Sequence, residues 1–166
     1  MKIIFLDIDG VISTSPCWGV GSNNKWGVYM FDTKCVAVLN LILRTTGAEI
    51  ILTSDWRTQH TLLEMCEIFT HNGVIKGPMG FTPSMKSYNS TNLEGGRVDE
   101  IKSWLHTHAW KDDIKWVAID DLNMGIEYAE KMESVGGGLK NFVHCPRHTE
   151  GIKQCGVKDK ILKLLI

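Results

Sequence analysis

Residues 3–10 read IIFLDIDG and place two carboxylates at the end of an apolar segment. The four residues at 3–6 favour β-structure, so they predict a short strand buried on both faces. Asp7 and Asp9 would then lie at the carboxyl end of the strand, where open α/β sheets bind their ligands. Neighbouring carboxylates repel each other unless a cation separates them or one stays protonated, and Mg²⁺ prefers oxygen ligands. The segment therefore indicates metal-assisted phosphoryl chemistry, with an acidic turn after a core strand as the alternative.

The composition is that of a soluble globular chain. It has 166 residues, of which 43% are hydrophobic and 22% charged, and its formal net charge is -1. This length predicts a single domain over residues 1–166, and the near-neutral charge gives no general attraction to nucleic acid or to a membrane surface. No segment approaches the roughly 20 apolar residues that span a bilayer. Five scattered cysteines without a CxxC pair predict free thiols and a cytoplasmic location.

Short apolar runs alternate with amphipathic segments along the chain. Strands are predicted at 3–6, 48–52, 115–119 and 141–144, and helices at 34–46, 58–72, 98–108, 125–132 and 158–166. Residues 12–33 form an irregular flap, and residues 73–96 form a loop in which a short strand is predicted at 73–75. This alternation predicts an α/β fold, a Rossmann-like parallel sheet sandwiched by helices.

Three of the predicted strands end in polar residues. In a parallel sheet these ends share one edge, so the following side chains are expected to converge: Asp7, Asp9, Thr53, Ser54, Asp120 and Asp121. Convergence of this kind points to a functional site more strongly than any one of the short motifs.

The order of these motifs resembles the haloacid dehalogenase (HAD) superfamily of phosphotransferases. The chain carries FLDIDG at 5–10, IILTS at 50–54, a basic residue at Arg97 and VAIDD at 117–121. Together they span residues 3 to 125. The run LTSDWR at 52–57, followed by RVDEI at 97–101, is also similar to the small HAD domains associated with RNA-repair proteins. The resemblance thus implies a HAD-like core with a minimal cap.

The resemblance implies a role for each aspartate. Asp7 would be the nucleophile that forms an aspartyl-phosphate, and Asp9 would protonate the leaving oxygen and then activate water. Asp120 and Asp121 would hold Mg²⁺ with Asp7, and Asp9 is a further candidate ligand. Which of Asp120 and Asp121 binds the metal directly stays open. As alternatives, Asp9 would be a turn residue and one of the later pair a helix N-cap.

Other residues would contact the phosphate. The resemblance implies that Thr53 donates a hydrogen bond to a phosphoryl oxygen, with Ser54 and Gly10 also at the substrate; a strand-end residue chosen for β-propensity is the alternative for Thr53. Arg57 is a further candidate for substrate binding, with a surface ion pair as its alternative.

The basic residue of the motif set is expected to be Arg97. It would neutralise Asp7 and the phosphoryl charge, although the family more often has lysine at this position. An exposed charge at the start of a helix is the alternative for Arg97. Lys86 and, more distantly, Lys102 compete for the same role.

The two insertions are too short to build a large lid. An open site admits a bulky substrate held at one end, and the flap aromatics Trp18, Trp26 and Tyr29 could either stack on a base or anchor the flap. We therefore expect a Mg²⁺-dependent phosphomonoesterase of nucleotide or nucleic-acid-end phosphates, with no membrane and no obligate protein partner. The alternatives are a phosphatase of small metabolites or phosphoproteins, a noncatalytic HAD-like binding module and a receiver-type phosphoacceptor.

Overall fold

Strands and helices alternate in the computed structural model, which describes residues 1–85, 93–108 and 114–166. The main elements are β1 (Lys2–Leu6), α1 (Thr33–Thr46), β2 (Glu49–Leu52), α2 (Leu62–His71), β3 (Gly80–Phe81), α3 (Leu93–Thr107), β4 (Lys115–Asp120), α4 (Ile126–Lys131), β5 (Phe142–His144) and α5 (Val157–Leu165). Three 3₁₀ turns are η1 (Ser15–Cys17), η2 (Asp55–Thr58) and η3 (Gly151–Lys153). The predicted α/β class is confirmed.

The five strands form one parallel sheet in the order β3-β2-β1-β4-β5. Leu6 of β1 pairs with Leu52 of β2 on one side and with Ile119 of β4 on the other. Because the three strands are in register, the residues that follow them emerge side by side. Strands β2 and β4 flank β1 although they are far apart in sequence, so the switch point of the sheet lies at the carboxyl end of β1.

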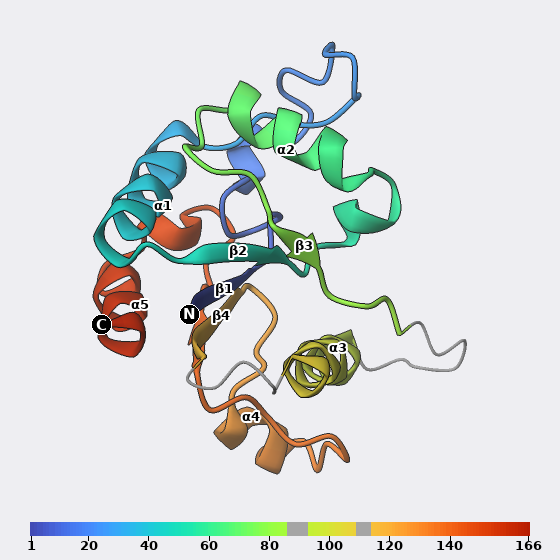
Figure 1. Ribbon diagram of the computed structural model, residues 1–166, viewed down its shortest axis with the longest axis vertical. Helices are drawn as coiled ribbons and strands as arrows, with labels where there is room; N and C mark the ends of the chain where they lie inside the picture. The colour runs from blue at the N-terminus through green and yellow to red at the C-terminus, as the bar shows by residue number, and fades with distance from the viewer. Residues whose placement is uncertain (86–92, 109–113) are drawn as a thin grey trace.

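Helices cover both faces of the sheet, as Figure 1 shows, with α1, α2 and α5 on one side and α3 and α4 on the other. Alternate residues of β1 enter different cores: Ile4 and Leu6 face the first side, and Ile3 and Phe5 the second. This is the pattern of a strand buried on both faces. The predicted sandwich, a Rossmann-like arrangement, is therefore present.

Local capping sets where α1 and α2 begin and end. Asp32 accepts hydrogen bonds from the first-turn N–H groups of α1, and Gly47 ends that helix in the left-handed conformation. Thr61 and Glu64 form a reciprocal capping box. Helix α2 therefore begins at Leu62, and the start predicted at residue 58 is wrong.

The segment between α2 and α3 differs most from expectation. The strand predicted at 73–75 is not formed, because the Val74 N–H donates to Phe69 at the end of α2 and the Ile75 N–H donates to the Asn40 side chain. The edge strand is instead the two-residue β3. Helix α3 begins at Leu93, earlier than the predicted residue 98, and includes two glycines of low helix propensity.

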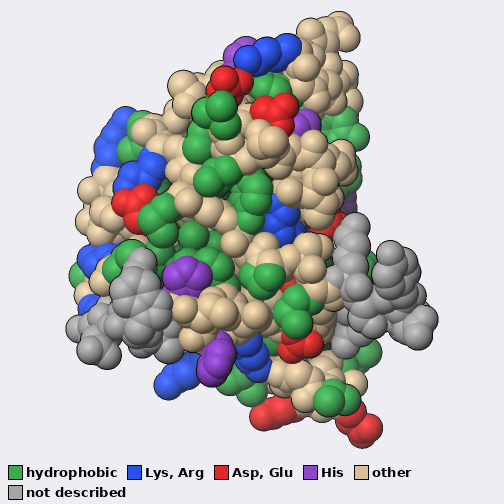
Figure 2. Space-filling model, turned by 45° about the vertical axis from the view of Figure 1, so that its right-hand side comes forward, with side chains coloured by type: hydrophobic (Ala, Val, Ile, Leu, Met, Phe, Trp, Pro, Cys, Tyr) green, Lys and Arg blue, Asp and Glu red, His purple; other side chains and the backbone are tan. Residues whose placement is uncertain are grey.

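Charges of both signs are mixed on the surface. On the face drawn in Figure 2, acidic and basic side chains are interspersed rather than gathered into one basic band. None of the helices formed by the described residues combines the length and the apolar character needed to cross a membrane.

Candidate functional site

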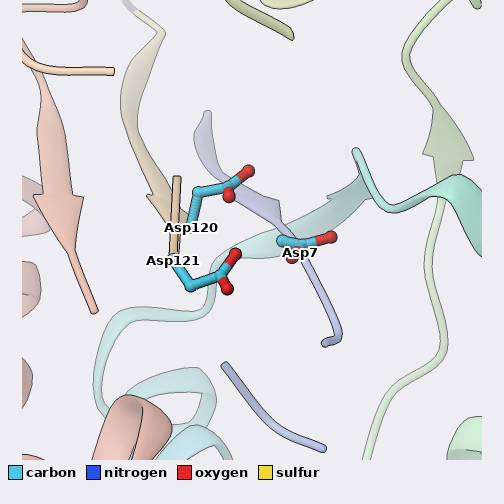
Figure 3. A group of neighbouring side chains, drawn as sticks. All are labelled: Asp7, Asp120 and Asp121. Atoms are coloured by element: carbon cyan, nitrogen blue, oxygen red, sulfur yellow. The ribbon is translucent and has the colours of Figure 1, made fainter. Parts of the chain in front are cut away.

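Three carboxylates meet where β1 and β4 end, as Figure 3 shows. Asp7 directly follows β1, and its N–H donates to the Ile119 carbonyl of β4 over 3.1 Å. Asp120 is the last residue of β4, and Asp121 follows it. One oxygen from each of Asp7, Asp120 and Asp121 lies within 4.8 Å of the others. The register of two parallel strands thus brings together residues more than a hundred positions apart.

Arg97 bridges two of these carboxylates from the second turn of α3. Its Nη1 donates to Asp7 Oδ1 over 3.2 Å and to Asp120 Oδ2 over 3.0 Å. Only 11% of its side chain is exposed, so the alternative of an exposed helix-start charge is wrong. Although burial opposes the change, Asp7 and Asp120 raise the pKa of Arg97 above its ordinary value.

One arginine does not balance the charge of the carboxylates. Burial raises the pKa of Asp7 to about 6, with Asp121 and Asp9 adding to the rise and Arg97 opposing it. Burial and the neighbouring Asp7 raise the pKa of Asp120 well above its ordinary value. The negative charges of these clustered carboxylates repel one another, and a bound cation would relieve this repulsion. The cluster therefore favours binding of a cation.

Asp9 is held by a single hydrogen bond from an aromatic side chain. Its Oδ2 accepts from Trp56 Nε1 over 2.8 Å, whereas its buried Oδ1 has no hydrogen-bond partner among the described residues. Burial raises the pKa of Asp9, and the charges of Asp121 and Asp55 add to this rise against the Trp56 hydrogen bond. A half-buried acid whose Oδ1 has no partner in the described structure is suited to give and take a proton.

Gly10 permits a close approach of the first loop to Asp121. The backbone at Gly10 has a φ of +73°, and a Cβ there would lie 2.6 Å from Asp121 Oδ2. The Ile8 carbonyl accepts N–H groups from each of residues 11–13, which closes the loop tightly. A side chain at position 10 would therefore displace Asp121. Contact of Gly10 with substrate stays a prediction.

The donor set fits a hard divalent cation. Asp7, Asp120 and Asp121 offer only oxygen ligands, two of them on buried residues. Mg²⁺ binds through one or two carboxylates together with water and substrate oxygens. The close packing of Gly10 against Asp121 keeps the third carboxylate near the other two.

Thr53 and Ser54 lie beside this cluster, at the carboxyl end of β2. The Thr53 N–H donates to the Leu6 carbonyl over 2.9 Å, which joins the ends of β1 and β2. Both residues are 1% exposed. The expected convergence at one edge is thus present for Thr53 and Ser54, while their contact with a phosphate stays a prediction.

Arg57, a candidate for substrate binding, is hydrogen-bonded within the protein. Its guanidinium donates to the carbonyls of Thr53, Ser54 and Thr82 and, over 2.5 Å, to the Glu100 carboxylate. Only 3% of its side chain is exposed, so the surface ion pair is wrong, while contact of Arg57 with substrate stays a prediction. Arg57 braces the turn that carries Thr53 and Ser54.

Lys102 does not replace Arg97 in the described structure. Lys102 donates to the Gly136 carbonyl over 2.5 Å, on the other side of α3 from the carboxylates. Lys86 lies outside the described residues. Among the described basic residues, Arg97 is the one bonded to the cluster.

Sequence reasoning missed Trp56 and Asp55. Trp56 belongs to the quoted LTSDWR run, but no role was predicted for it. Asp55 Oδ1 lies 3.7 Å from Arg97 Nη2 and 3.8 Å from Arg57 Nη1. The signal was their position directly after Thr53 and Ser54, because residues that follow a strand end of this sheet reach the site.

The comparison with known families agrees with this arrangement. A model described as the HAD domain in Swiss Army Knife RNA repair proteins matches residues 3–154. No curated protein and no solved structure matches the chain. The matched range contains β1, β2 and β4 with the carboxylates at their ends, as well as α3 with Arg97. The chain therefore belongs to the family of HAD domains found in Swiss Army Knife RNA repair proteins.

Proposed function

We propose that the protein is a Mg²⁺-dependent phosphomonoesterase that forms an aspartyl-phosphate on Asp7 and acts on nucleotide or nucleic-acid-end phosphates. Membership of the HAD family indicates phosphatase or hydrolase chemistry in general, and HAD proteins generally use Mg²⁺. The observation that carries the proposal is the pairing of Asp7, bonded to Arg97, with Asp9, whose buried Oδ1 is free. These are a nucleophile and a proton carrier two residues apart on one loop.

The first step transfers the phosphoryl group to the protein. A carboxylate oxygen of Asp7 forms a bond to phosphorus while the bond from phosphorus to the leaving oxygen breaks. Asp9 gives its proton to that leaving oxygen, which departs as an alcohol. The raised pKa of Asp9 favours the protonated state that this step needs. Arg97 stays beside Asp7 and offsets negative charge near the transferred group.

The second step returns the protein to its starting state. Asp9, now ionised, takes a proton from water while the water oxygen bonds to phosphorus. The bond between phosphorus and the Asp7 oxygen breaks, which releases inorganic phosphate and restores the Asp7 carboxylate. The Trp56 hydrogen bond keeps Asp9 in place through both proton transfers.

The cation would be held by Asp7, Asp120 and Asp121, with Asp9 as a further candidate ligand. When bound, Mg²⁺ supplies positive charge that stabilises the phosphoryl oxygens in the transition state. The protein's own contribution is to fix these carboxylates on two strand ends and to balance part of their charge with Arg97.

Two observations support a nucleotide or a nucleic-acid end over a long polyanion. The formal net charge is -1, and among the described residues on the face in Figure 2 the basic side chains form no band that would follow a phosphate backbone. The family is described from RNA repair proteins, in which a terminal phosphate is a reasonable target for a phosphatase. A single bound end therefore fits better than tight, nonspecific binding along a strand.

Phosphate release with Mg²⁺ tests the proposal. The panel contains a generic aryl phosphate, 3′- and 5′-mononucleotides, 3′- and 5′-phosphorylated oligonucleotides, a sugar phosphate and a phosphopeptide, with Asp7→Asn as control. We expect selective turnover of nucleotides or oligonucleotide ends that is lost in Asp7→Asn and after chelation of Mg²⁺. Turnover of a sugar phosphate or phosphopeptide alone would support the alternative substrates. A folded protein that binds Mg²⁺ but releases no phosphate would contradict the enzymatic function and favour a binding module.

A further inference from the structure

A pocket of 280 Å³ opens beside the carboxylate cluster, on the side of Asp9. One wall comes from residues 27–29 of the flap and includes Tyr29. The opposite wall comes from η2 and the residues after it, with Trp56, Gln59 and His60. Residues 12–33 and the end of β2 are far apart in sequence, so the pocket exists only because the flap folds over the carboxyl end of the sheet.

The position of Asp9 tells which part of a substrate enters this pocket. Under the mechanism proposed above, Asp9 gives its proton to the leaving oxygen, so the leaving group lies on the side of Asp9. Trp56 is 9% exposed, and its indole N–H is held on Asp9 Oδ2. Its ring is therefore a fixed wall next to the proton carrier, and the pocket is the space open to the leaving group.

The walls are aromatic and favour a ring. The ring centroids of Tyr29 and Trp56 lie 6.4 Å apart at an interplanar angle of 73°, and those of Trp56 and His60 lie 6.4 Å apart at 54°. Tyr29 remains 38% exposed, which leaves one face of its ring available to a ligand. The volume is close to the lower end of the roughly 300–1,000 Å³ of small-molecule sites, so it suits one ring-bearing group and not a folded polymer.

The other two flap aromatics are directed elsewhere. Trp18 stacks on His148 at a centroid distance of 5.8 Å. Trp26 packs against the main core and meets His71 edge to face. Of the three flap aromatics, Tyr29 is therefore the candidate for stacking on a base. Trp26 anchors the flap to the core.

The charges of the pocket disfavour an anion. Two carboxylates, Asp9 and Asp55, line it, and no lysine or arginine is among the described residues that do so. The Asp55 side chain is 69% exposed. Because Asp9 is protonated when the substrate binds, a second phosphate or a carboxylate in the leaving group would face the negative charge of Asp55. A neutral ring would instead meet aromatic surface and the polar side chains of Gln59 and His60.

We propose, resting on the phosphomonoesterase function above, that this pocket selects a neutral, base-bearing nucleoside as the leaving group. It binds the nucleoside of a nucleotide with a single phosphate, with the base against Tyr29. It discriminates against nucleotides that carry a second phosphate on the same sugar. Because the terminal sugar of a nucleic-acid end also carries an anionic phosphodiester, the inference narrows the proposed substrates to free nucleotides with one phosphate. Tyr29 and Asp55 are the residues that set this preference.

The test compares kcat/KM for three substrates in each series, the 3′- and the 5′-phosphates. They are the nucleoside monophosphate, the matching 1,2-dideoxyribose phosphate that lacks the base, and the nucleoside 3′,5′-bisphosphate. We expect the base to raise kcat/KM by about tenfold or more, the magnitude of one stacked base, and the second phosphate to lower it. Tyr29→Ala should lower the ratio of kcat/KM between the nucleoside monophosphate and the base-free compound to near one, and Tyr29→Phe should retain the ratio of the wild-type protein.

Two further variants separate the parts of the proposal. Trp18→Ala removes an aromatic side chain of similar exposure, 41% against 38%, from the same flap but outside the pocket, and should leave the substrate ratios unchanged. Asp55→Asn should raise turnover of the bisphosphate relative to the monophosphate. Equal loss of the base preference in Trp18→Ala and Tyr29→Ala would contradict a role for this pocket.

Failure of this inference differs from failure of the proposed function. If an aryl phosphate is hydrolysed in an Asp7-dependent way but the base has no effect, the pocket proposal is overturned and the enzymatic function stands. If a phosphotyrosine peptide exceeds every nucleotide and depends on Tyr29, the leaving group is a phenol and the nucleoside is rejected. If no phosphate ester is turned over, the proposed function itself fails.

Discussion

Two buried charge clusters lie next to each other in this molecule and differ in balance. In the carboxylate cluster, Asp7, Asp120 and Asp121 lie together, and the guanidinium of Arg97 is bonded to Asp7 and Asp120. In the second cluster, here called the Arg57 brace, the Arg57 side chain is bonded to three carbonyls and to Glu100. The first has excess negative charge, whereas the second has a hydrogen-bond partner for each group that takes part.

This difference in charge balance distinguishes the candidate functional site from a structural support. Glu100 Oε1 accepts the Met85 N–H over 3.0 Å while its Oε2 accepts from Arg57, so both oxygens are used within the protein. Asp9, by contrast, keeps a buried oxygen without a partner in the described structure. Unbalanced charge and an unpaired polar atom have a cost in stability, and they collect where a protein binds or reacts. The same two clusters should therefore respond in opposite ways to mutation.

The largest effect is expected for Asp7→Asn. An amide cannot form the phosphoryl bond, so kcat/KM for any substrate should fall by at least about 10³-fold, as for the removal of other catalytic nucleophiles. Phosphate release from an aryl phosphate with Mg²⁺ measures it, and circular dichroism checks the fold. Activity within tenfold of the wild-type protein would remove Asp7 from the mechanism.

Replacement of Arg97 should show that its Nη1 atom accounts for most of its contribution to catalysis. Nη1 alone donates to both Asp7 and Asp120, so a lysine ammonium can supply the same charge, although without the planar fork. We expect Arg97→Met to lower kcat/KM by about 10²-fold or more and Arg97→Lys by about tenfold. Equal losses in the two variants would mean that the second nitrogen, near Asp55, is needed as well.

Glu100→Gln should break the Arg57 brace and lower stability. Removal of one partner from a buried ion pair leaves an uncompensated charge, at a cost of about 3–5 kcal/mol in the free energy of unfolding. Urea denaturation measures this change. The matched control is Asp99→Asn, which alters an exposed carboxyl of the same helix and should change stability by less than about 0.5 kcal/mol. Similar losses in both variants would show that the pair has no special role.

The sequence predicted the carboxylate cluster better than the brace, for a physical reason. Asp7 and Asp120 each follow an apolar strand, and the rules of parallel sheets bring such ends together without knowledge of side-chain packing. The bonds from Arg57 to Glu100 and from Trp56 to Asp9 join residues 43 and 47 positions apart through packing alone. No local sequence pattern predicts these two contacts.

The edge strand β3 shows the same limit of prediction from sequence. β3 has only two residues, which is too short for an alternating or apolar pattern. It forms because the flanking N–H groups of Met79 and Thr82 find carbonyls on β2, at Ile50 and Leu52. The predicted strand at 73–75 contains two β-branched residues, but its N–H groups are used elsewhere: those of Gly73 and Val74 close the end of α2, and that of Ile75 donates to the Asn40 side chain.

The carboxylate cluster should also carry a stability cost that the brace does not. Because the pKa of Asp7 is raised from 3.8 to about 6 in the folded protein, the folded state holds a proton more tightly than the unfolded state does. Metal-free protein should therefore lose stability as the pH rises from about 4 to about 6. At pH 7 and with a chelator present, Asp7→Asn should be more stable than wild type by about 1–3 kcal/mol. Urea denaturation at pH 4.5 and 7.5 measures it, and a destabilised variant at both pH values would contradict the charge imbalance.

Replacement of Asp32 is expected to give the smallest change in the free energy of unfolding. The sign of this change is opposite to that for Asp7. Its side chain caps α1, accepts from Thr14 Oγ1 over 3.0 Å and pairs with Lys153. Although burial opposes them, the bonds from Lys153, the Cys35 N–H and Thr14 hold the pKa of Asp32 below its usual value. Its stabilisation is therefore present above the unfolded pKa near 4 and is lost as the pH falls through the lower folded pKa.

Asp32→Asn keeps an oxygen that can cap the helix. It removes the charge and the second oxygen, which accepts from Thr14 and Lys153. We expect a loss of about 0.5–1 kcal/mol at pH 7 that shrinks by pH 3, measured by urea denaturation. Between pH 4 and 6 Asp7 should lower the stability of the metal-free protein as it ionises, whereas Asp32, already ionised in the folded state, should not. Asp7→Asn and Asp32→Asn could instead change the free energy of unfolding with the same sign at pH 7. In that case stability would not distinguish a carboxyl with unbalanced charge from one whose charge is paired, and charge imbalance would not identify the functional site.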